Sequence, residues 1–310
     1  MTSYSPLVFK PECFDPSAVP PEPRAFNSKQ QGLTLKAPNW KEIGAAEYRR
    51  LRTAGKTPRP GATHLPSATG FELPSRDPGR SIPCRILGPQ NNKPVNAVFM
   101  HLHGGGWVLG DETYQDPMLQ AMANDHEYPF LAGPQDCYDV EERLVVNADG
   151  TFNAPLGFIG GESAGAHLSL LVVLHLLQHK KSEFSDCRLK GVLLHFGCYS
   201  LDWTPSVYNY RRGQPPLVLS MDLFNDFRNA FLPGWSQEML KDLLVSPLFA
   251  SLEQLMRRAP PALFTCGTED YHLDDTLFDG AEVGMQAADD FIASKVGLTA
   301  QSITLTPQLH

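Results

Sequence analysis

The sequence predicts an α/β fold in which a mostly parallel sheet is covered by helices on both faces. Short apolar runs alternate with helical patterns from residue 81 onward, and two of these runs lead directly into glycine-rich turns. The runs bounded by Gly or Pro are assigned to strands at 81–87, 96–103, 156–160, 190–196 and 262–267, with a possible short strand near Gly70–Leu73. Helical segments fit between them, notably at Ala164–Lys180 and Asp222–Phe231.

The N-terminal region differs in composition from the rest of the chain. Residues 1–35 are rich in Pro and in polar residues, so we expect a loosely ordered arm there. One helix is predicted to follow and to stop near Gly55, because four apolar residues fall near one of its faces. They are Trp40, Ile43, Tyr48 and Leu51.

Composition argues against several classes of partner. The formal net charge of -8 argues against nucleic acid or an anionic membrane surface as the main partner. No apolar run approaches the roughly 18 residues that span a bilayer, and no secretory signal is visible at the N-terminus. The six cysteines lie far apart without a CxxC pair, which indicates reduced thiols and a cytosolic protein. No His, Cys or Asp cluster is identified with ligand spacing, so we expect neither a metal nor an organic cofactor.

The stretch GFIGGESAGAHLSLLVVLHLL, residues 157–177, has the pattern of a nucleophile elbow. An apolar strand runs into Gly161-Glu162-Ser163-Ala164-Gly165 and on into an apolar helix, which is GxSxG in the strand–turn–helix context that this turn requires. The serine must occupy a strained turn for its Oγ to stand clear of the sheet, and the flanking glycines let strand and helix pass closely. Ser163 is therefore the candidate nucleophile.

Three consecutive glycines follow the strand at 96–103, within His103-Gly104-Gly105-Gly106-Trp107. A tight turn is the simplest interpretation of an isolated glycine triplet. About sixty residues before a candidate nucleophile, the same triplet can direct backbone N–H groups at the oxyanion of a tetrahedral acyl intermediate. We therefore assign the oxyanion hole to the N–H groups of Gly104, Gly105 and Ala164.

HGGGW followed by GESAG resembles the hormone-sensitive-lipase-like branch of the α/β-hydrolase fold, the fold-3 esterase family. The similarity extends over roughly residues 81–280. It implies that Asp270, just after the last predicted strand, is the acid that orients a catalytic histidine. Asp274 and Asp275 are close rivals, because the intervening YHL stands where the family has an apolar, proline-containing link. A plain surface-loop carboxylate is the alternative for Asp270.

The resemblance also implies a helical cap and an activity. Residues 1–55 would supply an N-terminal arm and cap helix, and an insertion at about 200–245 would complete the cap within a hydrolase domain of residues 56–310. The implied activity is serine-type hydrolysis of carboxylic esters with short acyl groups. The partner would be a small-molecule ester substrate.

The chain departs from the family pattern in its sheet. After a helix that ends near Asn124, the family has a buried strand with a Tyr-Arg-Leu-Ala-Pro-Glu-like motif, and this chain has no apolar run there. We therefore expect an incomplete sheet, one or two strands short of eight, whose neighbouring strands lack hydrogen-bond partners. Low or poorly cooperative thermal unfolding should follow.

The second departure concerns the catalytic histidine. Chain order in this fold is Ser, Asp, His, and only His272 and His310 follow Asp270. His272 is too near the acid, and His310 is the last residue and lacks the expected His-Gly-Phe-like context. The remaining histidines are interpreted mostly as packed or surface residues. Two functions therefore stand: an ester hydrolase, or an impaired member that is a ligand-binding pseudoenzyme or a truncated gene product.

Overall fold

The computed structural model describes residues 15, 17, 19–59, 61–90, 95–126, 134–147, 150–209, 216–217, 219–250 and 259–276. The strands are β1 Thr69–Pro74, β2 Ser81–Ile86, β3 Val98–Leu102, β4 Leu156–Glu162, β5 Gly191–His195 and β6 Ala262–Thr265. The helices are α1 Pro21–Thr34, α2 Trp40–Ile43, α3 Ala45–Thr53, α4 Asp116–His126, α5 Pro134–Val146, α6 Ala164–Gln178, α7 Ser182–Asp186, α8 Pro205–Asn209 and α9 Met221–Phe231. Two 3-10 helices, η3 Met239–Lys241 and η4 Pro247–Phe249, follow α9.

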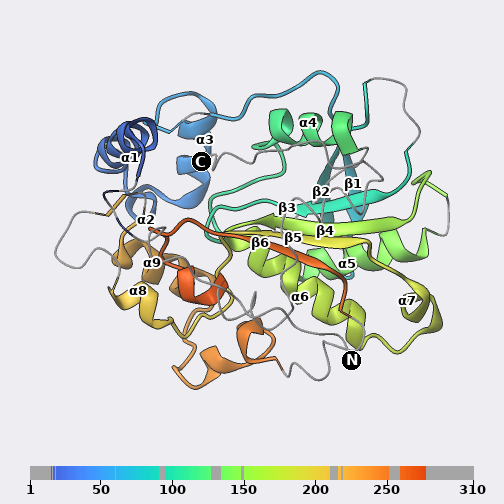
Figure 1. Cartoon of the computed structure of the whole chain (residues 1–310). Helices are drawn as coiled ribbons and strands as arrows, with labels where there is room; N and C mark the ends of the chain where they lie inside the picture. The colour runs from blue at the N-terminus through green and yellow to red at the C-terminus, as the bar shows by residue number, and fades with distance from the viewer. Residues whose placement is uncertain are drawn as a thin grey trace.

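The central sheet of the described residues has the strand order β3-β4-β5-β6, and its three pairs are all parallel (Figure 1). Parallel neighbours need a crossover connection, and α6 lies on the path from β4 to β5. β1 and β2 form a separate antiparallel hairpin that pairs Thr69 with Ile86 and Pro74 with Ser81. This architecture confirms the predicted α/β fold.

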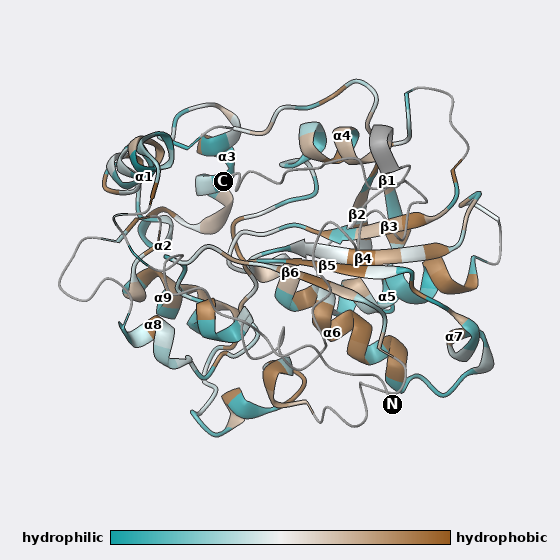
Figure 2. Cartoon of the chain, in the orientation of Figure 1, coloured by the Kyte–Doolittle hydropathy of each residue, from teal (hydrophilic) through white to brown (hydrophobic). Residues whose placement is uncertain are grey.

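Helices cover both faces of the sheet. On one face Met100, Leu102 and Ile159 are buried with the apolar side chains of α5 and α6. On the other, Phe99 and Phe158 pack with residues that include Leu119 of α4. Hydrophobic residues follow the central strands and most of α6, which is nearly all buried because it is apolar around its whole circumference (Figure 2). None of the described helices, α6 included, is long and apolar enough to cross a membrane.

The N-terminal helices and the 200–245 segment meet at one end of the molecule, on the left in Figure 1. The ring of Trp40 in α2 stacks on Phe227 in α9, with ring centroids 5.4 Å apart. The Gln31 side chain of α1 donates to the carbonyl oxygen of Pro216 at 3.3 Å. These contacts join the two segments that were expected to build a cap.

The N-terminal region differs from its prediction. The Pro-rich segment expected to be loosely ordered contains α1, which begins at Pro21 because proline is tolerated in the first turn of a helix. The single helix predicted to end near Gly55 is interrupted at Gly44, whose φ of 86° ends α2 before α3 begins. Residues 1–14 lie outside the described residues.

The predicted gap in the sheet falls between α4 and α5. The segment 127–133 between them lies outside the described residues, so the predicted absence of a strand there is not tested. Among the described strands, β3 forms its ladder with β4, and the β1–β2 hairpin stands as its own sheet. The total strand number and the poorly cooperative unfolding stay predictions.

Candidate active site

Ser163 lies at the turn between β4 and α6. Its backbone has φ 54° and ψ -122°, a conformation that residues other than glycine rarely adopt. Its N–H donates to the carbonyl oxygen of His195 in β5 at 2.9 Å, and its carbonyl accepts from the N–H of His167 at 3.1 Å. The sheet and the first turn of α6 therefore hold Ser163 in the sharp strand–turn–helix position that the sequence predicts.

The two glycines that flank Ser163 are required by close packing of the backbone. A Cβ on Gly165 would overlap the carbonyl oxygen of Leu102 and would lie 2.7 Å from the carbonyl oxygen of His103. A Cβ on Gly161 would overlap the same Leu102 oxygen and lie 2.8 Å from the carbonyl carbon of Gly165. The start of the glycine-rich loop therefore lies directly against the Ser163 turn.

The loop Gly104–Gly106 has a backbone that favours glycine. The φ angles of Gly105 and Gly106 are 122° and 60°, and that of Trp107 is 61°. A Cβ on Gly106 would come within 2.6 Å of Cγ in the Phe227 ring, so α9 packs closely on this loop. The N–H of Leu109 donates to the Gly105 carbonyl at 2.8 Å and closes the turn.

Glu162, the first of the two variable residues of the GxSxG pattern, connects the Ser163 turn to the glycine-rich loop. One of its oxygens accepts from the N–H of Gly104 at 2.7 Å and from the Gln115 side chain at 2.6 Å. The other lies 2.6 Å from Nε2 of the buried His101 in β3. Burial raises the pKa of Glu162 to about 8 and holds the pKa of His101 well below its usual value. The role of Glu162 was not predicted from the sequence, although a carboxylate next to a candidate nucleophile indicates a residue that could contact the site.

The contact with Glu162 changes the predicted oxyanion hole. The N–H of Gly104 is already committed to a carboxyl oxygen, so the assignment of Gly104 needs correction. Among the described residues, the N–H groups of Gly105, Gly106 and Ala164 donate to no protein acceptor. The loop and the N-terminus of α6 therefore retain three N–H groups that a ligand could use.

Asp275 is the most enclosed of the three candidate acids. Its side chain is fully buried, and its oxygens accept from the N–H groups of Tyr199 at 2.7 Å and Ser200 at 2.9 Å. The hydroxyl of Thr204 donates to it at 2.5 Å. Asp275 therefore fastens the loop after β5 to the segment after β6, and its oxygens are occupied by protein donors.

Asp274 and Asp270 have fewer partners. The N–H of Ser206 donates to Asp274 at 2.7 Å, and the N–H of His272 donates to one oxygen of Asp270 at 2.8 Å. Burial raises the pKa of Asp270, which is partly buried just after β6. Asp270 and Asp274 each keep one oxygen without a protein donor in the described part of the chain.

His272 is packed into the cap side of the molecule. The residue is 4% exposed, and its ring meets the Phe224 ring edge-on with centroids 4.9 Å apart. Atoms of Cys198, His272 and Asp275 lie within 4.8 Å of one another, all buried. Because protein donors already occupy the Asp275 oxygens, this trio is a buried polar cluster and a poor metal site.

His167, four residues after Ser163, has both ring nitrogens engaged. Its Nδ1 accepts from the Trp107 indole at 3.1 Å, and its Nε2 lies 2.8 Å from the carbonyl oxygen of Val245. Burial lowers the pKa of His167 to about 4, so the ring is neutral near pH 7. Its contacts join the glycine-rich loop, α6 and the cap, as expected for a packed histidine.

Three solved structures show a similar fold. A thermostable esterase from Pseudomonas putida is 20% identical with a TM-score of 0.65, and the match covers 86% of this chain and 83% of that one. A hyperthermophilic esterase from the archaeon Pyrobaculum calidifontis is also 20% identical, with a TM-score of 0.65 and coverage of 87% of both chains. A hormone-sensitive lipase from a metagenome library is 18% identical, with a TM-score of 0.62 and coverage of 84% of both chains.

A family model described as alpha/beta hydrolase fold matches residues 99–283. This match begins in β3 and includes the glycine-rich loop, the Ser163 turn and the three candidate acids. It covers more than half of the sequence, and the chain therefore belongs to the α/β-hydrolase fold-3 family.

Proposed function

We propose that this chain carries the site of a serine-type carboxylic-ester hydrolase, acting on small esters with short acyl groups. The observation that carries the proposal is the strained conformation of Ser163 at the end of β4, with the glycine-rich loop packed against its turn. Family membership supports it. The solved structures of similar fold include esterases and a hormone-sensitive lipase, which agrees with this reaction class.

In the proposed reaction, Ser163 Oγ attacks the ester carbonyl carbon and the carbonyl oxygen becomes an oxyanion. The N–H groups of Gly105, Gly106 and Ala164 stabilise it, since all three lack protein acceptors in the described residues. Ala164 is also the first residue of α6, where the helix dipole favours negative charge. The alkoxide leaves as the alcohol by taking up the proton that Ser163 gives up, and water then hydrolyses the acyl-serine to the carboxylic acid and restores the Ser163 hydroxyl. Gly106 replaces Gly104 in this assignment.

We assign the acid to Asp270. It follows β6 and is the residue to which the family resemblance gives this role. Like Asp274, it retains an oxygen that could accept from an imidazole, whereas the oxygens of Asp275 already accept from three protein donors. An acid in this role holds the base in the correct tautomer and stabilises its charged form.

The second candidate function is a catalytically impaired member of the family. His167 has both nitrogens engaged, and His272 is enclosed by the cap. His310, the remaining histidine after the acid, lies outside the described residues. A serine hydrolase without its base typically retains about 10³–10⁴-fold acceleration over water, so this chain would be a feeble esterase.

The two functions are separated by turnover of a short-chain p-nitrophenyl ester, measured beside Ser163→Ala. We expect slow hydrolysis and slow labelling of Ser163 by a fluorophosphonate probe. Ser163→Ala should abolish the labelling, whereas the part of the rate that the oxyanion hole and binding supply should persist in it. His310→Ala should change the rate little. If the wild type instead hydrolyses the ester at ordinary enzyme rates and His310→Ala abolishes this activity, His310 is the catalytic base and the protein is a complete hydrolase. Equal fluorophosphonate labelling of the wild type and Ser163→Ala would overturn the proposed nucleophile.

We further propose a cytosolic location. The cysteines of the described residues are free thiols, as expected in a reducing compartment. They are Cys84, Cys137, Cys187, Cys198 and Cys266.

A further inference from the structure

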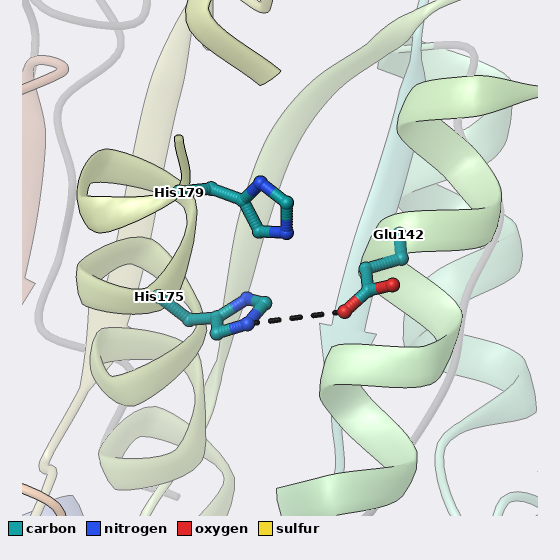
Figure 3. Close-up of side chains that lie close together, drawn as sticks. All are labelled: Glu142, His175 and His179. Atoms are coloured by element: carbon teal, nitrogen blue, oxygen red, sulfur yellow. Dashed lines mark ion pairs between the residues drawn. The ribbon is translucent and has the colours of Figure 1, made fainter. Parts of the chain in front are cut away.

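The C-terminal end of α6 carries two histidines on one face, at the opposite end of the helix from Ser163. His175 and His179 are four residues apart, so their side chains lie one above the other, with ring centroids 5.4 Å apart. Figure 3 shows both rings facing Glu142 across the gap between α6 and α5. Nε2 of His175 is 3.9 Å from a Glu142 oxygen, and one ligand atom from each of the three residues lies within 4.8 Å of the others.

The two imidazoles are held in place by their neighbours. Tyr138 stacks on His175 with centroids 4.4 Å apart, and Phe184 stacks on His179 at 3.7 Å. The fully buried Glu141 places an oxygen 2.7 Å from Nδ1 of His175. A carboxylate in this position fixes a proton on Nδ1 and leaves Nε2 as an electron-pair donor, which is how many metal-binding histidines are oriented.

We propose that Glu142, His175 and His179 bind a divalent transition-metal ion, with Zn²⁺ as the best match, and that Glu141 orients the first histidine. Two histidines and one carboxylate form a donor set that zinc accepts. With Zn–ligand distances of about 2.0–2.2 Å, ligand atoms around one ion lie about 3.4 Å apart, so rotamer adjustments of about 1 Å complete the site. The side chains of His175 and Glu142 are 25% and 33% exposed, so an ion can reach them.

Arg76 is the competing cation. Its guanidinium lies 3.2 Å from Oε1 of Glu142, the same oxygen that lies 3.9 Å from His175 Nε2, and it also forms an ion pair with Asp139. Metal binding therefore requires either that Arg76 give up this oxygen, or that the Glu142 carboxylate turn to place Oε2 on the metal while Oε1 stays with Arg76. Asp139 supplies Arg76 with a second anionic partner, so metal binding does not leave the guanidinium unpaired.

The site serves structure and not hydrolysis. In zinc peptidases a glutamate follows the first histidine of the His-x3-His pair and acts as general base, and here the buried Leu176 stands at that position. Ser163 lies twelve residues before His175, a distance of about 18 Å along the helix. A bound ion would therefore join α5 to the end of α6. His175 and His179, the two histidines of HLLQH, have this spacing in the sequence but were interpreted from it as packed or surface residues.

The test is Co²⁺ and Zn²⁺ binding to the untagged full chain, stripped of metal. Co²⁺ absorption in the visible region reports inner-sphere ligands, and elemental analysis after desalting gives the Zn²⁺ stoichiometry. We compare the wild type with His175→Ala, His179→Ala and Glu141→Gln. The controls are His64→Ala and Glu238→Gln, which alter exposed residues outside the cluster.

We expect one ion per chain and a Co²⁺ spectrum that either histidine variant abolishes. Glu141→Gln should weaken binding by about 10–100-fold, as loss of a carboxylate behind a histidine ligand does, and the controls should bind as the wild type does. Far-ultraviolet circular dichroism verifies that each variant is folded. The proposal would be overturned if the wild type took up no metal. It would also be overturned if folded His175→Ala and His179→Ala took up as much metal as the wild type.

Discussion

The nucleophile side and the acid side of the candidate active site are built in different ways. The nucleophile side consists of the Ser163 turn and the Gly104–Trp107 loop, where backbone segments touch so closely that side chains are excluded. The acid side is the segment 270–275, where three carboxylates accept hydrogen bonds from different sets of backbone and hydroxyl donors. The first is fixed by close packing of the backbone and the second by hydrogen bonds to individual side chains.

The two sides should therefore tolerate amino-acid substitutions to different degrees. On the nucleophile side a single added methyl group meets main-chain atoms that cannot move independently. On the acid side a substitution changes one hydrogen-bond partner, and the cost depends on how many donors that partner satisfies. Substitutions on the nucleophile side should therefore lower the free energy of unfolding more than substitutions on the acid side.

The largest effect is expected from Gly165→Ala. The new Cβ would overlap the Leu102 carbonyl oxygen and crowd that of His103, so β3 and α6 would have to separate. We expect a loss of more than about 4 kcal/mol in the free energy of unfolding, or an insoluble product. Gly32→Ala in α1, where nothing lies within 4 Å, is the matched control and should be neutral or stabilising by up to about 1 kcal/mol. Similar denaturation midpoints for both variants would contradict the close packing.

The next largest effect is a pH dependence of the free energy of unfolding, which reports whether Glu162 is protonated in the folded protein. Its pKa is raised to about 8 in the folded protein from an unfolded value of 4.5, so the folded state holds a proton that the unfolded state loses. Between about pH 5 and pH 8, this group should lower the free energy of unfolding as pH rises, by up to about 4 kcal/mol. Glu162→Gln removes that term, so the stability of the wild type relative to the variant should fall over this range.

Urea denaturation of both proteins at several pH values measures this difference and cancels groups common to both. A difference that does not change with pH would mean that Glu162 is ionised when folded. The pair with His101, whose Nε2 is 2.6 Å away, would then be charged, contrary to the low pKa that burial gives this histidine.

The nucleophile side could be predicted from the sequence because its signals are local. The strand assigned to 156–160 is observed at Leu156–Glu162, and the helix assigned to Ala164–Lys180 is Ala164–Gln178, so the turn falls at Ser163 as predicted. By contrast, α1 could not be found from periodicity because it buries no residue, and polar contacts such as Gln31 to Pro216 attach it.

Tertiary contacts decided what the sequence left open. Gly104 loses its assigned role because Glu162, fifty-eight residues later, turns its carboxyl toward that N–H. The oxygens of Asp275 are occupied because donors arrive from the loop after β5, whereas Asp270 accepts from the nearby His272 N–H. Neither fact has a local pattern, since each depends on chain segments that folding brings together.

A third prediction compares these two acids. Asp275→Asn places an amide where two backbone N–H groups and the Thr204 hydroxyl donate, so we expect a loss of about 2–3 kcal/mol in the free energy of unfolding. Asp270→Asn disturbs one backbone hydrogen bond and should cost about 1 kcal/mol or less. If Asp270 orients a base, its variant should lose ester turnover while remaining folded. Loss of turnover in a stable Asp275→Asn, with Asp270→Asn fully active, would reverse the assignment.

The smallest effect concerns the strain at Ser163. Its φ of 54° and ψ of -122° are unfavourable for a side chain and cost about 1–3 kcal/mol, whereas glycine adopts them readily. Ser163→Gly should therefore be more stable than Ser163→Ala by about 1 kcal/mol, because the strain relieved exceeds the extra chain entropy that glycine gives the unfolded state. Both variants remove the hydroxyl, so the lost side-chain contacts largely cancel and chemical denaturation of the pair reports the backbone alone. A more stable alanine variant would mean that the turn is relaxed, and the strain that carries the proposed function would lose its physical basis.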